Sequence, residues 1–157
     1  DSTSSRGLGD VYKRQCYDLW FPETSRALAL AGAELIINPT LTPTKDREME
    51  TLMVRTTAAQ QQAYYIDVNS CGDQGCGLSI AADTEGNILH QSSNEEDIFT
   101  IDVDFEVSHN SRIKGFMNLG QNLKSYRDNR FNELIDITQN EDYLDSLGDL
   151  KDFNKEK

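Results

Sequence analysis

The sequence is short of positive charge. Its 157 residues include 15 Lys and Arg against 27 Asp and Glu, which gives a formal net charge of -12 at pH 7. A surface with this excess repels the phosphates of nucleic acids and the headgroups of anionic lipids. We therefore expect no nucleic acid and no membrane among the partners of this protein.

A long apolar run is also missing. A membrane-spanning helix needs roughly 20 consecutive apolar residues, and the longest candidates here are interrupted by Gly32, Glu34 and Asn38. The chain is long enough for one domain with a core, which we expect over residues 16–130. Residues 1–15 resemble a translated adaptor or linker, the alternative being a natural flexible N-terminus. Residues 131–157 are rich in acidic side chains and predict an acidic C-terminal tail.

Cysteine and histidine are scarce. The three cysteines are Cys16, Cys71 and Cys76, an odd number without a secretory leader, which predicts no disulfide framework and a reducing, cytoplasmic location. Cys71 and Cys76 flank GDQG, but His90 and His109 are distant and lack zinc-site spacing. GDQGCG also lacks the lysine of a phosphate-binding loop. We expect no metal and no organic cofactor.

The remaining pattern alternates between helix and strand signals, which indicates an α/β fold. Pro22 and Glu23 suit the start of a helix that ends near Gly32, and a second helix is expected from Pro43 to about Gln62. The apolar stripe of that second helix, which includes Met49, Leu52 and Met53, is predicted to face the core. The expected strands are AELIINP, YYIDVNS, a hairpin of LSIAAD with ILHQ, and IFTIDVDF. Beyond Val107 the sequence is polar and irregular.

Cys16 is the candidate nucleophile. A thiol reacts as its thiolate, and the start of a helix favours negative charge. Cys16 stands just before the helix predicted from Pro22, on a strand-to-helix turn of the kind that exposes nucleophiles. The alternative is that Cys16 is a small buried apolar residue, which is the commoner environment of a lone cysteine.

Three stretches then resemble one family. They are CYDLWFPETSRALALAGAELIINPT, RTTAAQQQAYYIDVNSCGDQGCGLSIAADTEGNIL and IFTIDVDFEVSHNSR, and in this order they resemble the C-terminal half of the nitrilase superfamily of carbon-nitrogen hydrolases. The resemblance implies a truncated αββα four-layer sandwich and hydrolysis of nonpeptide C–N bonds through a cysteine acyl-enzyme. It also implies a small amide, N-carbamoyl compound or nitrile as substrate, and a homo-oligomer when the protein is full length.

The same resemblance assigns roles to individual residues. Cys16 is the expected nucleophile, and the backbone N–H of Tyr17 is an expected oxyanion donor. Asp18 is expected to brace the turn or to act as a simple N-cap. The substrate pocket is expected to use Asn38, Pro39 and Thr40, although an ordinary strand-ending turn is an equal alternative for this segment.

The departures from the family pattern lie upstream of the cysteine. A glutamate base, a lysine and a further glutamate are expected there, but this chain has only linker-like sequence, and DVYKRQ stands where an apolar strand should lead to Cys16. We therefore predict a carbon-nitrogen hydrolase as the full-length parent and an inactive fragment. The alternative is a noncatalytic binding or assembly module that keeps the nitrilase-like fold.

Overall fold

The computed structural model describes residues 10–13, 16–115, 119–129 and 141–148. By its internal contacts the chain divides into two compact units, Asp1–Ser125 and Tyr126–Lys157. The first unit contains the sheet and the helices that pack on it. The second contains the short helix α6 (Glu141–Ser146).

A five-stranded mixed sheet forms the base of the first unit, with the strand order β1-β2-β3-β4-β5. The strands are β1 (Asp10–Lys13), β2 (Ala33–Thr40), β3 (Tyr64–Asn69), β4 (Ile80–Ala82) and β5 (Ile88–Gln91). The first three run parallel, and β4 and β5 continue the sheet in antiparallel pairing. Because parallel neighbours end at the same edge, the carboxyl ends of β2 and β3 meet beside the segment that follows β1.

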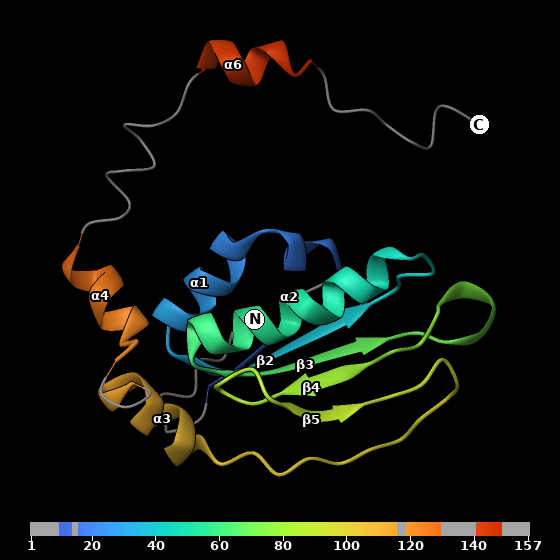
Figure 1. Cartoon of the computed structure of the whole chain (residues 1–157), viewed down its shortest axis with the longest axis horizontal. Helices are drawn as coiled ribbons and strands as arrows, with labels where there is room; N and C mark the ends of the chain where they lie inside the picture. Colours follow the sequence, from blue (N-terminus) through green and yellow to red (C-terminus); the bar gives the residue numbers. More distant parts are fainter. Residues whose placement is uncertain (1–9, 14–15, 116–118, 130–140, 149–157) are drawn as a thin grey trace, which may run out of the picture. The chain divides into compact units, whose positions relative to one another are not determined.

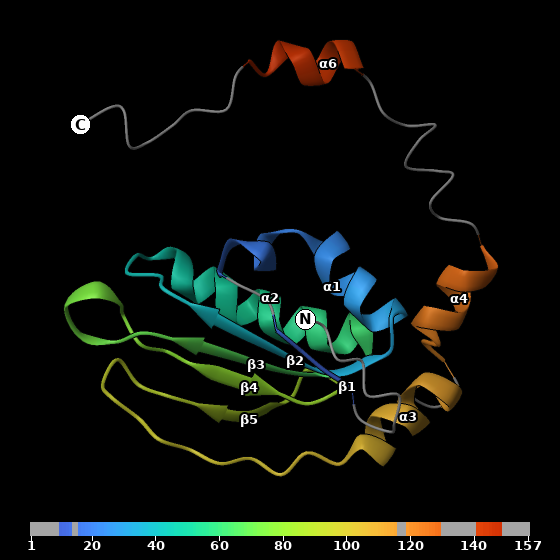
Figure 2. The same ribbon diagram turned by 180° about the vertical axis from the view of Figure 1, so that it is seen from behind.

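Two helices cover one face of this sheet, as both ribbon views show (Figure 1, Figure 2). They are α1 (Pro22–Leu30) and α2 (Asp46–Gln61). Pro22 occupies the first helical position of α1, and Gln62 closes α2 in a left-handed conformation with φ 51°. The α/β class, both predicted helices, the strands AELIINP and YYIDVNS, and the hairpin are thus confirmed.

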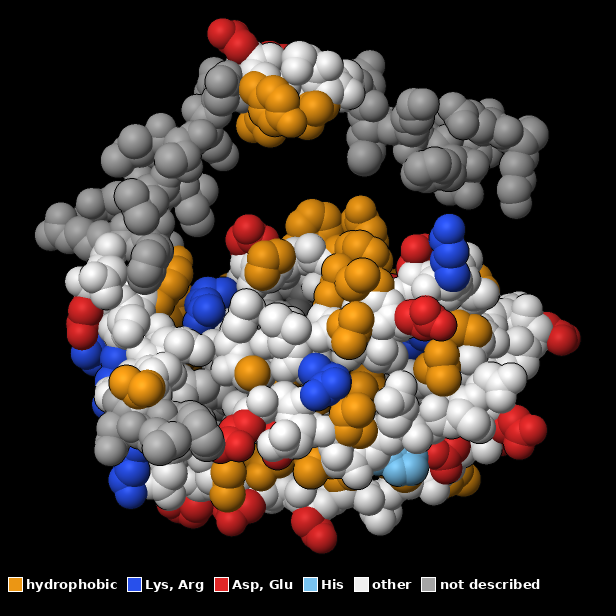
Figure 3. Space-filling model, in the orientation of Figure 1, with side chains coloured by type: hydrophobic (Ala, Val, Ile, Leu, Met, Phe, Trp, Pro, Cys, Tyr) orange, Lys and Arg blue, Asp and Glu red, His pale blue; other side chains and the backbone are white. Residues whose placement is uncertain are grey.

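The predicted core face of α2 is only partly right: Met53 packs against the core cluster, whereas Met49 and Leu52 do not lie in it. Met49 is 49% and Leu52 is 53% exposed, and Figure 3 shows apolar side chains at the surface of the helical layer. The buried face instead carries Val54 and Ala58 together with the charged residues Arg47 and Glu50. The reason is that Asp67 on β3 forms an ion pair with Arg47 and holds the polar side of the helix inward, which hydrophobic periodicity does not predict. The core cluster consists of Leu19, Ala33, Ile36, Val54, Ala58, Tyr65, Ile80 and Ala82.

Two further expectations fail. IFTIDVDF is not a strand: residues 98–104 have no regular secondary structure, and its last residue, Phe105, begins helix α3 (Phe105–Lys114). This helix continues past Val107 into the region expected to be irregular. The side chains of this segment do alternate between exposed and half-buried, but the backbone forms no ladder with β5. Conversely, DVYK is strand β1, paired in parallel with β2, although residues 1–15 were expected to hold no strand. DVYK is a strand because its backbone pairs with the edge of β2, and its polar sequence does not predict this pairing.

Hydrogen bonds from a side chain of α3 to backbone carbonyl oxygens connect α3 to the C-terminal end of α2. Arg112 of α3 donates hydrogen bonds to the carbonyl oxygens of Ala33, Gln61 and Gln62. Burial lowers the pKa of its guanidinium, while Glu34 opposes this change. α3 therefore fixes the end of α2 against the start of β2. The next helix, α4, spans Asn122–Asp128.

Candidate active site

Cys16 lies between β1 and α1, where it begins the short 3₁₀ helix η1 (Cys16–Trp20). Its side chain is half-buried and its φ is +39°. Such a left-handed conformation is uncommon for a residue other than glycine, and it is found preferentially at functional sites, where the surrounding structure maintains the strain. The backbone thus holds Cys16 in a sharp turn between a strand and a helix.

A chain of hydroxyl groups leads from Cys16 into the protein. Thr40, the last residue of β2, donates a hydrogen bond from Oγ1 to Cys16 Sγ at 3.4 Å. The Oγ1 atoms of Thr40 and Thr42 are 3.3 Å apart, and Thr42 Oγ1 donates to Glu50 Oε1 at 3.1 Å. The cysteine is therefore connected through two threonines to a carboxylate that is 4% exposed.

Glu50 belongs to a buried charged cluster at the N-terminal half of α2. Arg47, 1% exposed, forms ion pairs with Glu50 Oε2 at 3.2 Å and with Asp67 Oδ1 at 2.6 Å. Trp20 Nε1 donates a further hydrogen bond to Glu50 Oε1 at 3.3 Å. Burial raises the pKa of Asp67, and its neighbours Arg47 and Asn38 oppose this change. The cluster fixes α2 against β3 directly behind the threonines.

The structure places the other predicted residues of β2 close to this cluster. Asn38 is fully buried and donates from Nδ2 to Asp67 Oδ2 at 2.6 Å, while its Oδ1 has no hydrogen-bond partner among the described residues. Pro39 and Thr40 are half-buried. Thr40 thus reaches Cys16 directly, whereas Asn38 is linked to the charged cluster. Their substrate-binding roles remain predictions.

Tyr17 and Asp18 lie on the outer side of η1. The Tyr17 side chain is 67% exposed, and its ring contacts Phe21 edge-to-face at a centroid distance of 5.2 Å. Asp18 is exposed, and its carbonyl oxygen accepts hydrogen bonds from Phe21 N–H and Thr24 Oγ1. Because Phe21 is the N-cap of α1, the backbone of Asp18 braces the turn from three residues before the cap. The oxyanion role of Tyr17 N–H stays a prediction.

The sequence reading missed four members of this site, namely Thr42, Arg47, Glu50 and Asp67. A signal was present, since Arg47 and Glu50 stand three residues apart on one side of a helix, and Asp67 interrupts the apolar strand YYIDVN. A charged residue at an inward strand position needs a partner. The chain alone did not show which residue that partner was.

Of the other two thiols, Cys76 adjoins this site through the backbone of Thr42. All three cysteines are free, and Cys76 donates from Sγ to the Thr42 carbonyl oxygen at 3.1 Å, beside the 3₁₀ helix η2 (Gly72–Gln74). Within the described ranges, no three His, Cys, Asp or Glu side chains come together as a metal site. None of the helices described has the length and apolar character to cross a membrane.

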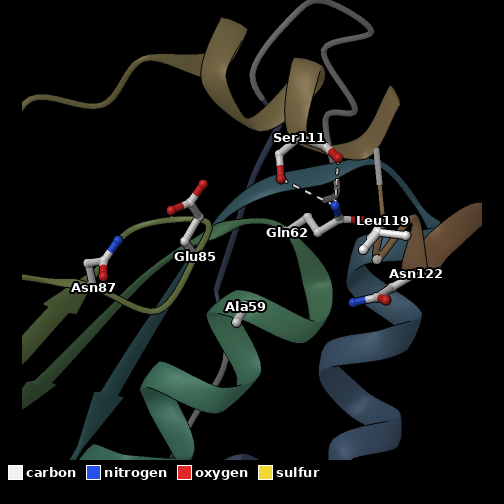
Figure 4. Close-up of a pocket in the computed structure, with 8 residues that line it drawn as sticks. Ala59, Gln62, Glu85, Asn87, Ser111, Leu119 and Asn122 are labelled. Atoms are coloured by element: carbon white, nitrogen blue, oxygen red, sulfur yellow. Dashed lines mark hydrogen bonds between the residues drawn. The ribbon is translucent and has the colours of Figure 1, made fainter. Parts of the chain in front are cut away.

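One hollow of the first unit lies away from Cys16. It measures about 460 Å³ and lies at the opposite end of α2, where Ala59, Gln62 and Ser111 line it (Figure 4). Gln62 Nε2 donates to the Ser111 carbonyl at 2.6 Å, so its amide is held by α3. The Gln62 Oε1 atom is buried without a partner among the described residues. The left-handed turn and the chain of polar contacts are at Cys16 and not at this hollow.

The fold and this arrangement define a mixed α/β protein with a half-buried thiol at a turn between a strand and a helix. The chain belongs to the carbon-nitrogen hydrolase family, whose model matches residues 14–112. The family predicted from the sequence motifs is thereby confirmed.

Similar proteins support this assignment. A Pseudomonas protegens protein described as "Hydrolase in pqqF 5'region" is 32% identical over 125 residues, which cover 77% of this chain and 41% of that protein. An (R)-stereoselective amidase from a Pseudomonas species is 33% identical over 96 residues, or 58% of this chain and 35% of the amidase. The crystal structure of a carbon-nitrogen hydrolase from Helicobacter pylori superposes with a TM-score of 0.67 at 22% identity, covering 82% of this chain and 50% of that one. The chain thus spans half or less of these proteins.

Proposed function

We propose that this chain is the C-terminal part of a hydrolase that cleaves nonpeptide C–N bonds in small amides, N-carbamoyl compounds or nitriles. Cys16 is the nucleophile. The observation that carries the proposal is the left-handed conformation of Cys16 at the turn before η1, in a chain of the carbon-nitrogen hydrolase family. The amidase name of one relative supports an amide as the first substrate to test.

The proposed reaction proceeds through an acyl-enzyme. A general base takes the thiol proton of Cys16, and the thiolate adds to the carbon of the C–N bond. With an amide or N-carbamoyl compound, the base passes this proton to the leaving nitrogen, the C–N bond breaks, and the acyl group stays on sulfur as a thioester that water hydrolyses. With a nitrile, the addition and return of the proton give a thioimidate, and water adds to it before ammonia leaves and the thioester forms. In this scheme the backbone N–H of Tyr17 stabilises the oxyanion, and Thr40 contacts the reacting sulfur.

We propose that the parent protein supplies the base and a second oxyanion donor from a segment upstream of Cys16, as the glutamate and lysine of the family resemblance. Loss of a positioned base typically costs about 10²–10⁴-fold in rate, and loss of an oxyanion donor about 10²–10³-fold. Multiplied together, these losses give a deficit of roughly 10⁴–10⁷ for the chain alone, which is an upper limit because the effects of residues that act together are not additive. The chain as given should therefore release no measurable ammonia from a small amide.

The test is to restore the upstream half. Residues 10–157, which include β1, are fused to the N-terminal half of a family amidase, and ammonia release is measured with a panel of amides, N-carbamoyl compounds and nitriles. We expect turnover by the fusion, no turnover after Cys16→Ser, and turnover retained after Cys71→Ser, the matched thiol control. Equal losses from Cys16→Ser and Cys71→Ser would remove the assignment of the nucleophile.

Mass spectrometry separates catalysis from the noncatalytic alternative. During turnover an acyl adduct should be trapped on the peptide that contains Cys16. A fusion that folds and binds amides, yet forms neither ammonia nor an adduct, would favour a binding or assembly module.

A further inference from the structure

The hydroxyl groups of Thr40 and Thr42 take part in three hydrogen-bond contacts but carry only two protons between them. Their hydroxyl groups fill three contacts: 3.4 Å to Cys16 Sγ, 3.3 Å between the two Oγ1 atoms, and 3.1 Å to Glu50 Oε1. Each hydroxyl carries only one proton. Ionised Glu50, paired with Arg47, only accepts hydrogen bonds, so the Thr42 proton is directed to Glu50. The contact between the two threonines can then be filled only by the proton of Thr40.

The Thr40 proton therefore has two competing acceptors. When Cys16 is a neutral thiol, its S–H can donate to Thr40, and Thr40 donates to Thr42, so that all three contacts are filled. When Cys16 is a thiolate, its sulfur is the charged acceptor and attracts the Thr40 proton more strongly than the Thr42 oxygen does. The hydroxyl then turns from Thr42 to the sulfur.

We propose that Thr40 is a positioning residue that donates a hydrogen bond to the Cys16 thiolate, and that Thr42, held by Glu50, competes for the same proton. This inference rests on the proposed function, because it concerns the nucleophile assigned there. Thr40 keeps its proton throughout and only rotates, while the thiol proton leaves to the general base. Thr40 accordingly favours the thiolate, and Thr42 favours the neutral thiol.

Alkylation of the chain as it exists tests both roles without turnover. In a Cys71→Ser/Cys76→Ser background Cys16 is the only thiol, and its rate of reaction with iodoacetamide follows the thiolate fraction. At about pH 7.5, Thr40→Val should slow alkylation about tenfold, since a charge-assisted hydrogen bond is lost. Thr42→Val should instead accelerate alkylation about threefold, since the contact between Thr40 and Thr42 is filled only in the neutral state, whereas the bond from Thr42 to Glu50 is lost from both states alike. The pH of half-maximal rate should move upward in the first variant and downward in the second.

The double variant and three controls complete the design. In Thr40→Val/Thr42→Val the rate should equal that of Thr40→Val, because Thr42 acts only through the Thr40 hydroxyl. Thr40→Ser should restore most of the rate. Thr44→Val removes a hydroxyl that donates to Asp46, the first residue of α2, and that lies outside the chain of contacts; it should leave the rate unchanged. Thr40→Ala serves as a second hydroxyl-free variant if Thr40→Val does not fold, with circular dichroism reporting the fold of each.

Three results would overturn the proposal. They are a Thr40→Val rate within twofold of Thr44→Val, slower alkylation in Thr42→Val, and single effects that simply add in the double variant. Opposite signs and full dependence on Thr40 are not expected from general loosening of the turn. A negative alkylation result would overturn the role of Thr40 without bearing on hydrolysis by the fusion. A fusion that does not hydrolyse amides would overturn the proposed function, and the alkylation rates could still be interpreted.

Discussion

Replacing Arg47 should lower the free energy of unfolding, because Arg47 neutralises the buried charged cluster. Its guanidinium forms ion pairs with Asp67 and Glu50 and donates twice to the Leu78 carbonyl, at 2.8 and 3.2 Å, while almost fully buried. Arg47→Met keeps the apolar bulk but leaves two carboxylates uncompensated in the interior. Breaking a buried ion pair from one side typically costs about 3–5 kcal/mol, so we expect a loss of this size in the free energy of unfolding at about pH 7.

The loss should depend on pH with a defined sign. Burial already raises the pKa of Asp67, and removing Arg47 removes the first opposing influence, so the pKa rises further. For a carboxyl group with a raised pKa in the folded state, stability is greatest below the unfolded pKa of about 3.9 and falls as pH rises through the folded pKa. The destabilisation caused by Arg47→Met should therefore shrink as pH is lowered from about 7 to about 5.

Urea unfolding followed by circular dichroism at these two pH values measures the effect. The exposed pair Arg127–Asp128 provides the control, and Arg127→Met should leave the midpoint unchanged. Arg47→Met/Asp67→Asn/Glu50→Gln, which removes all three charges, should be more stable than Arg47→Met at about pH 7 and should lose its pH dependence. A destabilisation below about 1 kcal/mol, or one of equal size at both pH values, would refute the electrostatic reasoning.

Three further outcomes can be measured. His90 hydrogen-bonds Asp97 at 2.7 Å and lowers the pKa of that carboxyl. His90→Phe should therefore raise the Asp97 pKa in a carbon-13 NMR titration. The stability that Asp97 contributes is present above its unfolded pKa and is lost as pH falls through its folded pKa. Arg112→Leu removes the bonds from α3 to three carbonyls and should destabilise the chain by about 1–3 kcal/mol, with increased amide exchange at the end of α2; unchanged exchange there would contradict it. Gly77→Ala should lower the melting temperature, because φ is +67° and an added Cβ would lie 2.6 Å from the Ser93 carbonyl oxygen; an unchanged melting temperature would show that the loop adjusts freely.

The position of the cysteine could be predicted from local sequence, and its surroundings could not. CYDLWFPE contains the turn, the first helical proline and the nucleophile in consecutive residues, so nearby chemistry determines them. Thr40 is 24 residues from Cys16, and Glu50, which bonds both Thr42 and Trp20, is 30 residues from Trp20. Contacts at that separation depend on how β2 and α2 pack, which no local pattern encodes.

Local sequence determined the helix α1, the strands β2 and β3, the β4–β5 hairpin and the family of this protein, because apolar periodicity and turn residues act within a few positions. Tertiary structure decided the rest. The pairing edge of β2 makes a strand of polar DVYK, while IFTIDVDF, which alternates like a strand, forms no ladder. A buried charge needs a partner of opposite charge, and Asp67 on β3 provides one for Arg47. The Arg47 side of α2 therefore faces the sheet, and Met49 stays about half exposed.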